Sequence, residues 1–219
     1  MIDYTLETHF SIDRSSPLTV LCTYEDEWKD IYASLKDINV PDAGFIVLRG
    51  FDWNKYMSPW KADAVLKGEP AFGGLADEFI VEITKRIIPD VIKADGLTPS
   101  AIYIAGYSMA GLFAMYSLYN TDIFDGAASC SGSLWYPKFI EYAKEKSFAG
   151  NNPKIYLSVG DKEAKTRNPV MRTVEDNTRA LYEYYRNMGL EVSFELNPGN
   201  HFADVAMRTA KGISSILAQ

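Results

Sequence analysis

A short apolar segment runs directly into a turn of small residues and then into a helical pattern at residues 101–113, AIYIAGYSMAGLF. Within it, Gly106, Ser108 and Ala110 fill a G-x-S-x-[GA] pattern between a predicted strand and a predicted helix. Small residues on either side of the serine let strand and helix approach closely. Such a turn, called a nucleophile elbow, lifts the serine hydroxyl to where a base can remove its proton. The alternative is an ordinary strand–turn–helix with an incidental serine, and the flanking pattern favours the elbow.

The rest of the chain alternates between strand-like and helix-like segments. We expect strands at residues 4–12, 18–23, 44–48, 126–131, 155–159 and 191–196, and helices at 26–36, 74–93, 108–119, 137–146, 169–188 and 202–217. Strands that alternate with helices need crossover connections, which predicts a mostly parallel sheet with helices on both faces. At 219 residues the chain suits one α/β domain, residues 1–219, and no internal repeat or linker divides it.

Charge and hydropathy exclude several classes of partner. The net charge of −7 and the absence of any Lys/Arg cluster argue against a nucleic acid or an anionic membrane as the partner. No apolar run approaches the length of a membrane span. The first residues, MIDYTLETHFSIDRSS, show no secretory pattern, so we expect a cytoplasmic protein whose partner is a small molecule. The sequence leaves the oligomeric state open.

Cysteine and histidine usage argues against metal or cofactor chemistry as the basis of function. Cys22 and Cys130 lie inside apolar strand-like runs, which predicts two buried free thiols rather than a disulfide. The chain has two histidines, His9 and His201, and no Cys/His spacing typical of a metal site. It has no P-loop and no G-x-G-x-x-G motif. We therefore expect neither a metal nor a cofactor.

The candidate base for Ser108 is His201. It follows the last predicted strand in NPGNHF, and in a parallel sheet such loops open on the carboxyl edge, where the elbow also lies. His9 precedes the core of the sheet and has no catalytic surroundings in the sequence. The alternative for His201 is a capping or exposed loop residue.

The candidate acid lies in VGDKEA, after the strand at 155–159. Both Asp161 and Glu163 precede the histidine, in the order Ser, acid, His. We favour Glu163, because its longer side chain can reach back toward His201, whereas Asp161 can turn into solvent or brace the loop. A Ser–His dyad without an acid remains a third alternative.

Backbone amides are the expected donors to a developing oxyanion. The turn aims the N–H of Met109 at that position. A second donor is expected after the strand at 18–23, from the amide of Tyr24 or Glu25, although no H-G-G motif marks it.

An aromatic loop, FDWNKYMSPW, follows the strand at 44–48 and faces the same edge. Trp53 and Trp60 are candidates for the wall of a substrate pocket, and packing over the end of the sheet explains them equally well. Trp135, in SGSLWY, fits packing better.

The segments GYSMAGLFA, FDGAASCSGSLWYP, YLSVGDKE, NPGNHF and DWNKYMSPW together resemble a branch of the α/β-hydrolases. That branch includes esterase D, feruloyl esterases, mycolyltransferases and enterochelin-type siderophore esterases. The resemblance spans about Leu18 to Leu217 and implies an α/β-hydrolase fold without a cap domain. It also implies Ser108 as nucleophile, His201 as base and an acid in the loop Asp161–Glu163, where Glu163 matches the glutamate that several members use. Ala110 stands where the strict motif has glycine, and the chain lacks the extra N-terminal domain of enterochelin esterases.

These observations together predict a serine esterase that cleaves a carboxylic ester through an acyl-enzyme. An open site without a cap suits small or exposed esters. Acyl transfer to an alcohol acceptor by the same residues is one alternative. A non-catalytic binding protein on the same fold is the other, which the intact Ser, acid and His positions disfavour.

Overall fold

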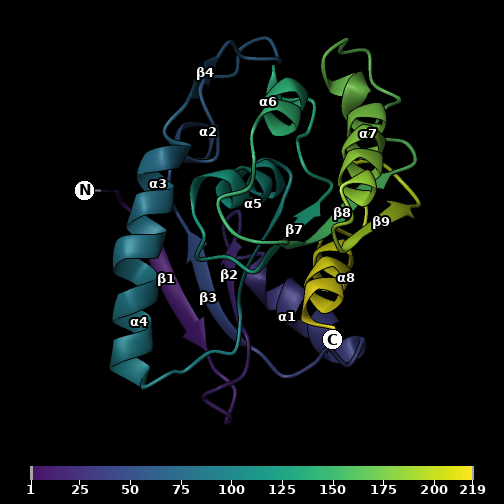
Figure 1. Cartoon of the computed structure of the whole chain (residues 1–219). Helices are drawn as coiled ribbons and strands as arrows, with labels where there is room; N and C mark the ends of the chain where they lie inside the picture. The colour runs from purple at the N-terminus through teal and green to yellow at the C-terminus, as the bar shows by residue number, and fades with distance from the viewer. Residues whose placement is uncertain (1, 219) are drawn as a thin grey trace.

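The computed structural model describes residues 2–218 and centres on a seven-stranded sheet with the order β1-β3-β2-β6-β7-β8-β9 (Figure 1). The strands are β1 (Thr5–His9), β2 (Leu18–Cys22), β3 (Gly44–Arg49), β6 (Ile102–Tyr107), β7 (Gly126–Cys130), β8 (Lys154–Gly160) and β9 (Val192–Asn197). β1 pairs with β3 antiparallel, and every other neighbouring pair is parallel. The α/β sheet predicted from the alternating pattern is confirmed.

Helices cover both faces of this sheet. One face packs against α1 (Trp28–Asp37) and α8 (Val205–Leu217). The other packs against α3 (Ala76–Glu82), α4 (Ile88–Asp95), α5 (Met109–Asn120), α6 (Phe139–Glu145) and α7 (Val174–Asn187). α5 is buried from Met109 to Tyr119 and lies against the middle of the sheet (Figure 1). A helix that is apolar on all sides is stable only when it is enclosed in this way.

Two segments differ from the pattern expected for them. The helix expected at 74–93 is divided, because a π-helical turn at Ile83–Ile87 separates α3 from α4. Pro89, near the start of α4, has no N–H to donate and its ring crowds the preceding turn, which accounts for the break. The aromatic loop expected after the strand at 44–48 contains a short helix, α2 (Trp53–Tyr56), and leads into a small hairpin of β4 (Lys61–Ala62) with β5 (Phe72–Gly73).

The two cysteines lie in the sheet as free, buried thiols, as expected from their apolar runs. Burial raises the pKa of both thiols far above the ordinary range, so they stay protonated and unreactive in the folded protein. None of the helices within residues 2–218 has the length and apolar character needed to cross a bilayer.

Candidate active site

Ser108 occupies a strained turn between β6 and α5, with φ 58° and ψ −121°. A side chain on Gly106 would lie 2.5 Å from the Ala110 methyl group, so only glycine fits there. Ala110 fills the space that Gly106 leaves open, which explains why alanine is accepted in the last small position of the motif. The turn is held by the neighbouring loop: Ser108 N–H donates to Cys130 O at 3.1 Å, and Ser133 N–H donates to Ser108 O at 2.9 Å. The local geometry is that of the predicted elbow.

His201 lies between the serine hydroxyl and a buried carboxylate. Its Nε2 is 3.0 Å from Ser108 Oγ, and its Nδ1 is 2.7 Å from Glu163 Oε2. A carboxylate can only accept, so the pair of contacts is satisfied when Nδ1 carries the proton and Nε2 is free to accept from the hydroxyl. The structure therefore brings together the three residues selected from the sequence, from loops that follow β6, β8 and β9.

Glu163, and not Asp161, is the acid that contacts His201. Its side chain is 3% exposed, and its Oε1 accepts from Gly160 N–H at 2.6 Å. Asp161 is exposed and accepts instead from Gly199 N–H at 2.7 Å, so it braces the loop that carries His201. This geometry matches the preferred alternative for the acid, and it gives Asp161 the bracing position that was its other interpretation.

A buried arginine on α8 completes the surroundings of the carboxylate. Arg208 is 1% exposed, and its Nη1 lies 3.3 Å from Glu163 Oε1. The same nitrogen lies 3.3 Å from Ser131 Oγ, and Nη2 donates to Pro198 O at 2.8 Å. A charge taken out of water is tolerated only when it is paired and hydrogen-bonded. Arg208 thus offsets the burial of Glu163 and ties β7, β8 and the His201 loop together.

Tyr107 holds the backbone of His201 in place. Its hydroxyl donates to the His201 carbonyl oxygen at 2.8 Å, and Arg208 Nη1 donates to that hydroxyl at 3.2 Å. The two rings lie 5.3 Å apart, centroid to centroid. Burial raises the pKa of Tyr107, so the hydroxyl remains protonated and able to donate at neutral pH.

Two cavities of about 220 Å³ each meet at Ser108. Ser133, Trp135 and Met171 line both of them. The Trp53 cavity extends under the 50–73 segment and is lined further by Trp53, Val65, Leu66, Pro70, Phe72 and Met109. The His201 cavity extends toward the loop after β8 and is lined further by His201, Lys162, Lys165, Thr166, Asn200 and Phe202. A bound ester can therefore place one part on each side of the hydroxyl.

The tryptophans that line the two cavities are only partly the ones expected from the sequence. Trp53 lines the cavity named after it, as expected for a pocket wall. Trp60 lines neither cavity: its indole N–H donates to Pro137 O at 3.1 Å and its ring packs against Tyr136 and Tyr142, which corresponds to the packing alternative. Trp135, expected to be structural, lines both cavities.

Of the residues expected to supply an amide to an oxyanion, Met109 lines a cavity at the site and Tyr24 and Glu25 do not. Met109 is the first residue of α5 and lines the Trp53 cavity next to Ser108. The N–H groups of a first helical turn have no partner within the helix. Tyr24 N–H donates to Glu27 Oε2 at 3.1 Å, and neither Tyr24 nor Glu25 lines either cavity. The structure thus leaves the second donor unassigned.

A protein-family model described as "Putative esterase" matches residues 27–203. The chain belongs to this esterase family. The matched range contains the elbow, the acid loop and the histidine loop, whereas Arg208 lies beyond its end. Membership identifies the chain as one of a hydrolase family.

Relatives of this esterase-family chain are distant in sequence. The Bacillus subtilis (strain 168) protein YbbA, described as uncharacterized, is 24% identical over 135 residues, which are 60% of this chain and 54% of YbbA. The match thus spans about half the length of that curated relative. Siderophore hydrolase EstA from Aspergillus nidulans superposes with a TM-score of 0.78 at 19% identity, over 96% of this chain and 88% of EstA. An IroE-like serine hydrolase from Shewanella oneidensis gives 0.79 at 16% identity, over 97% and 74%. These likenesses establish the α/β-hydrolase fold.

Three contributors to the esterase-family site were missed from the sequence: Arg208, Tyr107 and Ser133. Ser133 Oγ lies 3.4 Å from Ser108 Oγ, in the segment SGSLWY that carries the family resemblance. The signal for Arg208 is an arginine directly before Thr209 and Ala210 on a helix whose buried residues are mostly apolar. Within residues 2–218, no group of three or more His, Cys, Asp or Glu side chains is arranged to hold a metal ion.

Proposed function

We propose that the protein is a serine esterase that hydrolyses a carboxylic ester through an acyl-enzyme on Ser108. The observation that carries the proposal is the continuous hydrogen-bond chain from Glu163 through His201 to Ser108 at a strained elbow. Membership of an esterase family supports ester hydrolysis, and the hydrogen-bond chain supports the serine mechanism. The partner is a small-molecule ester, which two cavities of about 220 Å³ each can hold on either side of the hydroxyl.

Acylation begins when Ser108 Oγ attacks the ester carbonyl carbon while His201 Nε2 takes the hydroxyl proton. The carbonyl π electrons move onto oxygen and form a tetrahedral oxyanion. Glu163 holds the imidazolium in place and stabilises its charge. The oxyanion then collapses, the bond to the alcohol oxygen breaks, and His201 gives its proton to the leaving alcohol.

Deacylation repeats these steps with water as the nucleophile. His201 takes a proton from water, whose oxygen attacks the acyl carbon. Collapse of the second tetrahedral intermediate breaks the bond to Ser108 Oγ, and His201 returns the proton to that oxygen. The products are a carboxylic acid and an alcohol, and the enzyme is regenerated.

The Met109 N–H is the proposed oxyanion donor, since it starts α5, where the helix dipole also favours negative charge. The Tyr24 and Glu25 amides remain the candidates for the second donor. For Tyr24 this requires release of its hydrogen bond to Glu27 when substrate binds. Loss of one such donor costs about 100- to 1,000-fold in rate.

A fluorophosphonate probe tests the nucleophile directly. We expect a single phosphonyl adduct, found by mass spectrometry on the peptide that contains Ser108, together with burst kinetics on p-nitrophenyl esters of short acids. The esters tested should also include an ester siderophore, because EstA carries the name of a siderophore hydrolase. Labelling of another residue, or an unlabelled protein that still hydrolyses esters, would contradict the serine mechanism. Ser108→Ala supplies the unlabelled control.

A further inference from the structure

The two cavities at Ser108 differ in the charged groups that line them. The Trp53 cavity is lined mostly by apolar residues, among them Trp53, Val65 and Leu66, and Glu69 is the charged residue in its lining. The His201 cavity also has apolar residues, such as Val174 and Phe202, and in addition two lysines, Lys162 and Lys165. An ester that spans both cavities therefore meets cationic side chains on one side of the hydroxyl only.

The mechanism assigns one half of the substrate to each cavity. His201 Nε2 must hand its proton to the leaving oxygen, so the alcohol half lies against His201. That places the alcohol in the cavity that contains Lys162 and Lys165. The acyl half then occupies the apolar Trp53 cavity, on the side of the Met109 N–H. Both cavities are smaller than those that hold drug-sized ligands, about 300 Å³ or more, so each half is small.

The lysines stand out against the charge of the chain as a whole. The chain carries a net charge of −7, yet residues 161–173 hold four cationic side chains, Lys162, Lys165, Arg167 and Arg172, and two acidic ones. Both acidic groups are engaged: Glu163 contacts His201 and Arg208, and Asp161 accepts from Gly199 N–H.

Lys162 and Lys165 themselves are exposed, and within residues 2–218 neither forms an ion pair. Most lysines in this range are likewise unpaired, and Lys29, Lys154 and Lys211 are the ones in ion pairs, so what sets Lys162 and Lys165 apart is their position at the cavity. Two ammonium groups at the mouth of a small cavity, with no carboxylate paired to them, favour an anion there.

Resting on the proposed esterase function, we propose that the preferred substrate is an ester of a small apolar acid with an alcohol that carries an anionic group, such as a carboxylate. Lys162 and Lys165 bind that anion beside His201 and so determine leaving-group specificity. Binding of an anionic alcohol half also explains why residues 161–173 are cationic in a protein whose net negative charge repels anions.

A matched pair of substrates tests the assignment: the butyrate esters of 4-hydroxybenzoate and of 4-hydroxybenzamide, alike in size and acyl group and different in charge. We expect the ratio of kcat/KM, anionic over neutral, to fall roughly three- to tenfold in Lys162→Gln/Lys165→Gln, the effect of two partly screened charges. The ratio for the unmodified enzyme should fall similarly when ionic strength is raised to about 1 M.

Lys85→Gln/Lys93→Gln is the control, because it removes two exposed positive charges from the π-helical turn and α4, outside both cavities. This variant should leave the ratio unchanged. A ratio that is the same in the Lys162/Lys165 variant as in the unmodified enzyme, or that falls equally in the control, would overturn the assignment while leaving the esterase proposal intact. Failure of the unmodified enzyme to cleave either ester would instead count against the esterase proposal.

Discussion

The two opposite edges of the sheet each carry a histidine, a serine and an acid. Only at one of these edges do hydrogen bonds link the three side chains. At the carboxyl edge, His201 contacts both Ser108 and Glu163. At the amino edge, His9 ends β1, and its Nε2 accepts from the Trp28 indole N–H at 2.8 Å. The His9 ring also stacks on Tyr32, with centroids 5.8 Å apart. His9 is therefore part of a packed aromatic group.

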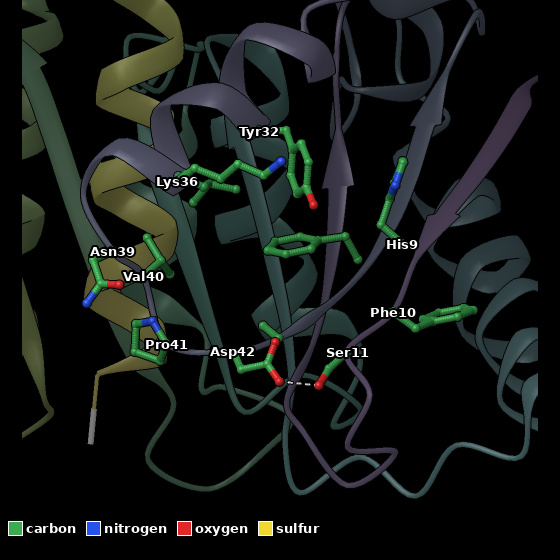
Figure 2. A pocket seen from close by; sticks show the side chains of 12 residues that line it. His9, Phe10, Ser11, Tyr32, Lys36, Asn39, Val40, Pro41 and Asp42 are labelled. Carbon is green, nitrogen blue, oxygen red and sulfur yellow. Dashed lines mark hydrogen bonds between the residues drawn. The ribbon is translucent and has the colours of Figure 1, made fainter.

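The amino edge also has a cavity, of about 330 Å³, which is larger than either cavity at Ser108 (Figure 2). In it, the Ser11 hydroxyl donates to Asp42 and Lys36 Nζ lies over the Tyr32 ring (Figure 2). A carboxylate is too weak a base to activate a hydroxyl at neutral pH, and His9 is already occupied by Trp28. Cavity volume and residue types therefore do not distinguish the two edges. The hydrogen-bond chain from acid through histidine to serine does, because within residues 2–218 it is formed at the carboxyl edge and not at the amino edge.

Ser108→Ala against Ser11→Ala gives the largest expected contrast. Removal of the nucleophile should lower kcat by about 10⁶-fold, to the level that binding and the oxyanion donor sustain alone. Ser11→Ala should leave kcat within about twofold, because Ser11 donates to the weakly basic Asp42 carboxylate and not to a histidine. Steady-state hydrolysis of a p-nitrophenyl ester measures both. Equal losses in the two variants would show that the edges do not differ as described.

Glu163→Gln against Asp161→Asn separates the two acids of one loop. The amide keeps the shape of the side chain but favours the wrong histidine tautomer, so kcat should fall about 10³- to 10⁴-fold. Asp161→Asn should cost less than about tenfold, since Asp161 holds only the Gly199 N–H. If Asp161→Asn proved the more harmful, Asp161 rather than Glu163 would be the acid of the mechanism.

Arg208→Met tests a positioning residue that touches no reacting atom. The change leaves Glu163 without its buried cation, so we expect about 10- to 100-fold loss in kcat/KM and about 3–5 kcal/mol lower stability. Arg208→Lys, which keeps the positive charge, should restore part of the lost activity.

Lys211→Met is the matched control, because Lys211 lies on the same helix and contacts Glu195 at the surface. It should leave kcat/KM unchanged. An unchanged kcat/KM in Arg208→Met, with only stability reduced, would make Arg208 purely structural.

The order of the elements and the main residues of the site could be predicted, because both depend on local patterns. Strands and helices follow apolar periodicity, and a parallel sheet brings the loops that hold Ser108, Glu163 and His201 to one edge. The break at Ile83–Ile87 was missed, although Pro89 offered a signal. The apolar periodicity is not interrupted at this turn, so periodicity alone predicted one continuous helix.

The remaining parts depend on contacts that no local pattern encodes. Trp60 and Trp135 have similar sequence surroundings, and their positions depend on how the 50–73 segment folds over Ser133. Arg208 forms its contacts with loops far away in the chain, so its burial cannot be inferred from its helix alone. A backbone N–H can be supplied by almost any residue type, so the sequence carries no signal for the second oxyanion donor.

His9→Phe gives the smallest expected effect, on stability and not on activity. Phenylalanine keeps the stacking on Trp28 and Tyr32 but leaves the buried Trp28 N–H without its acceptor, at a cost of about 1–3 kcal/mol. Urea unfolding should show this loss while kcat/KM stays within about twofold. Trp28→Phe added to His9→Phe removes both partners, so the double variant should lose less stability than the sum of the two single changes. A loss of turnover above about tenfold in His9→Phe, with stability unchanged, would mean that the amino edge takes part in the reaction and that the contrast between the edges is wrong.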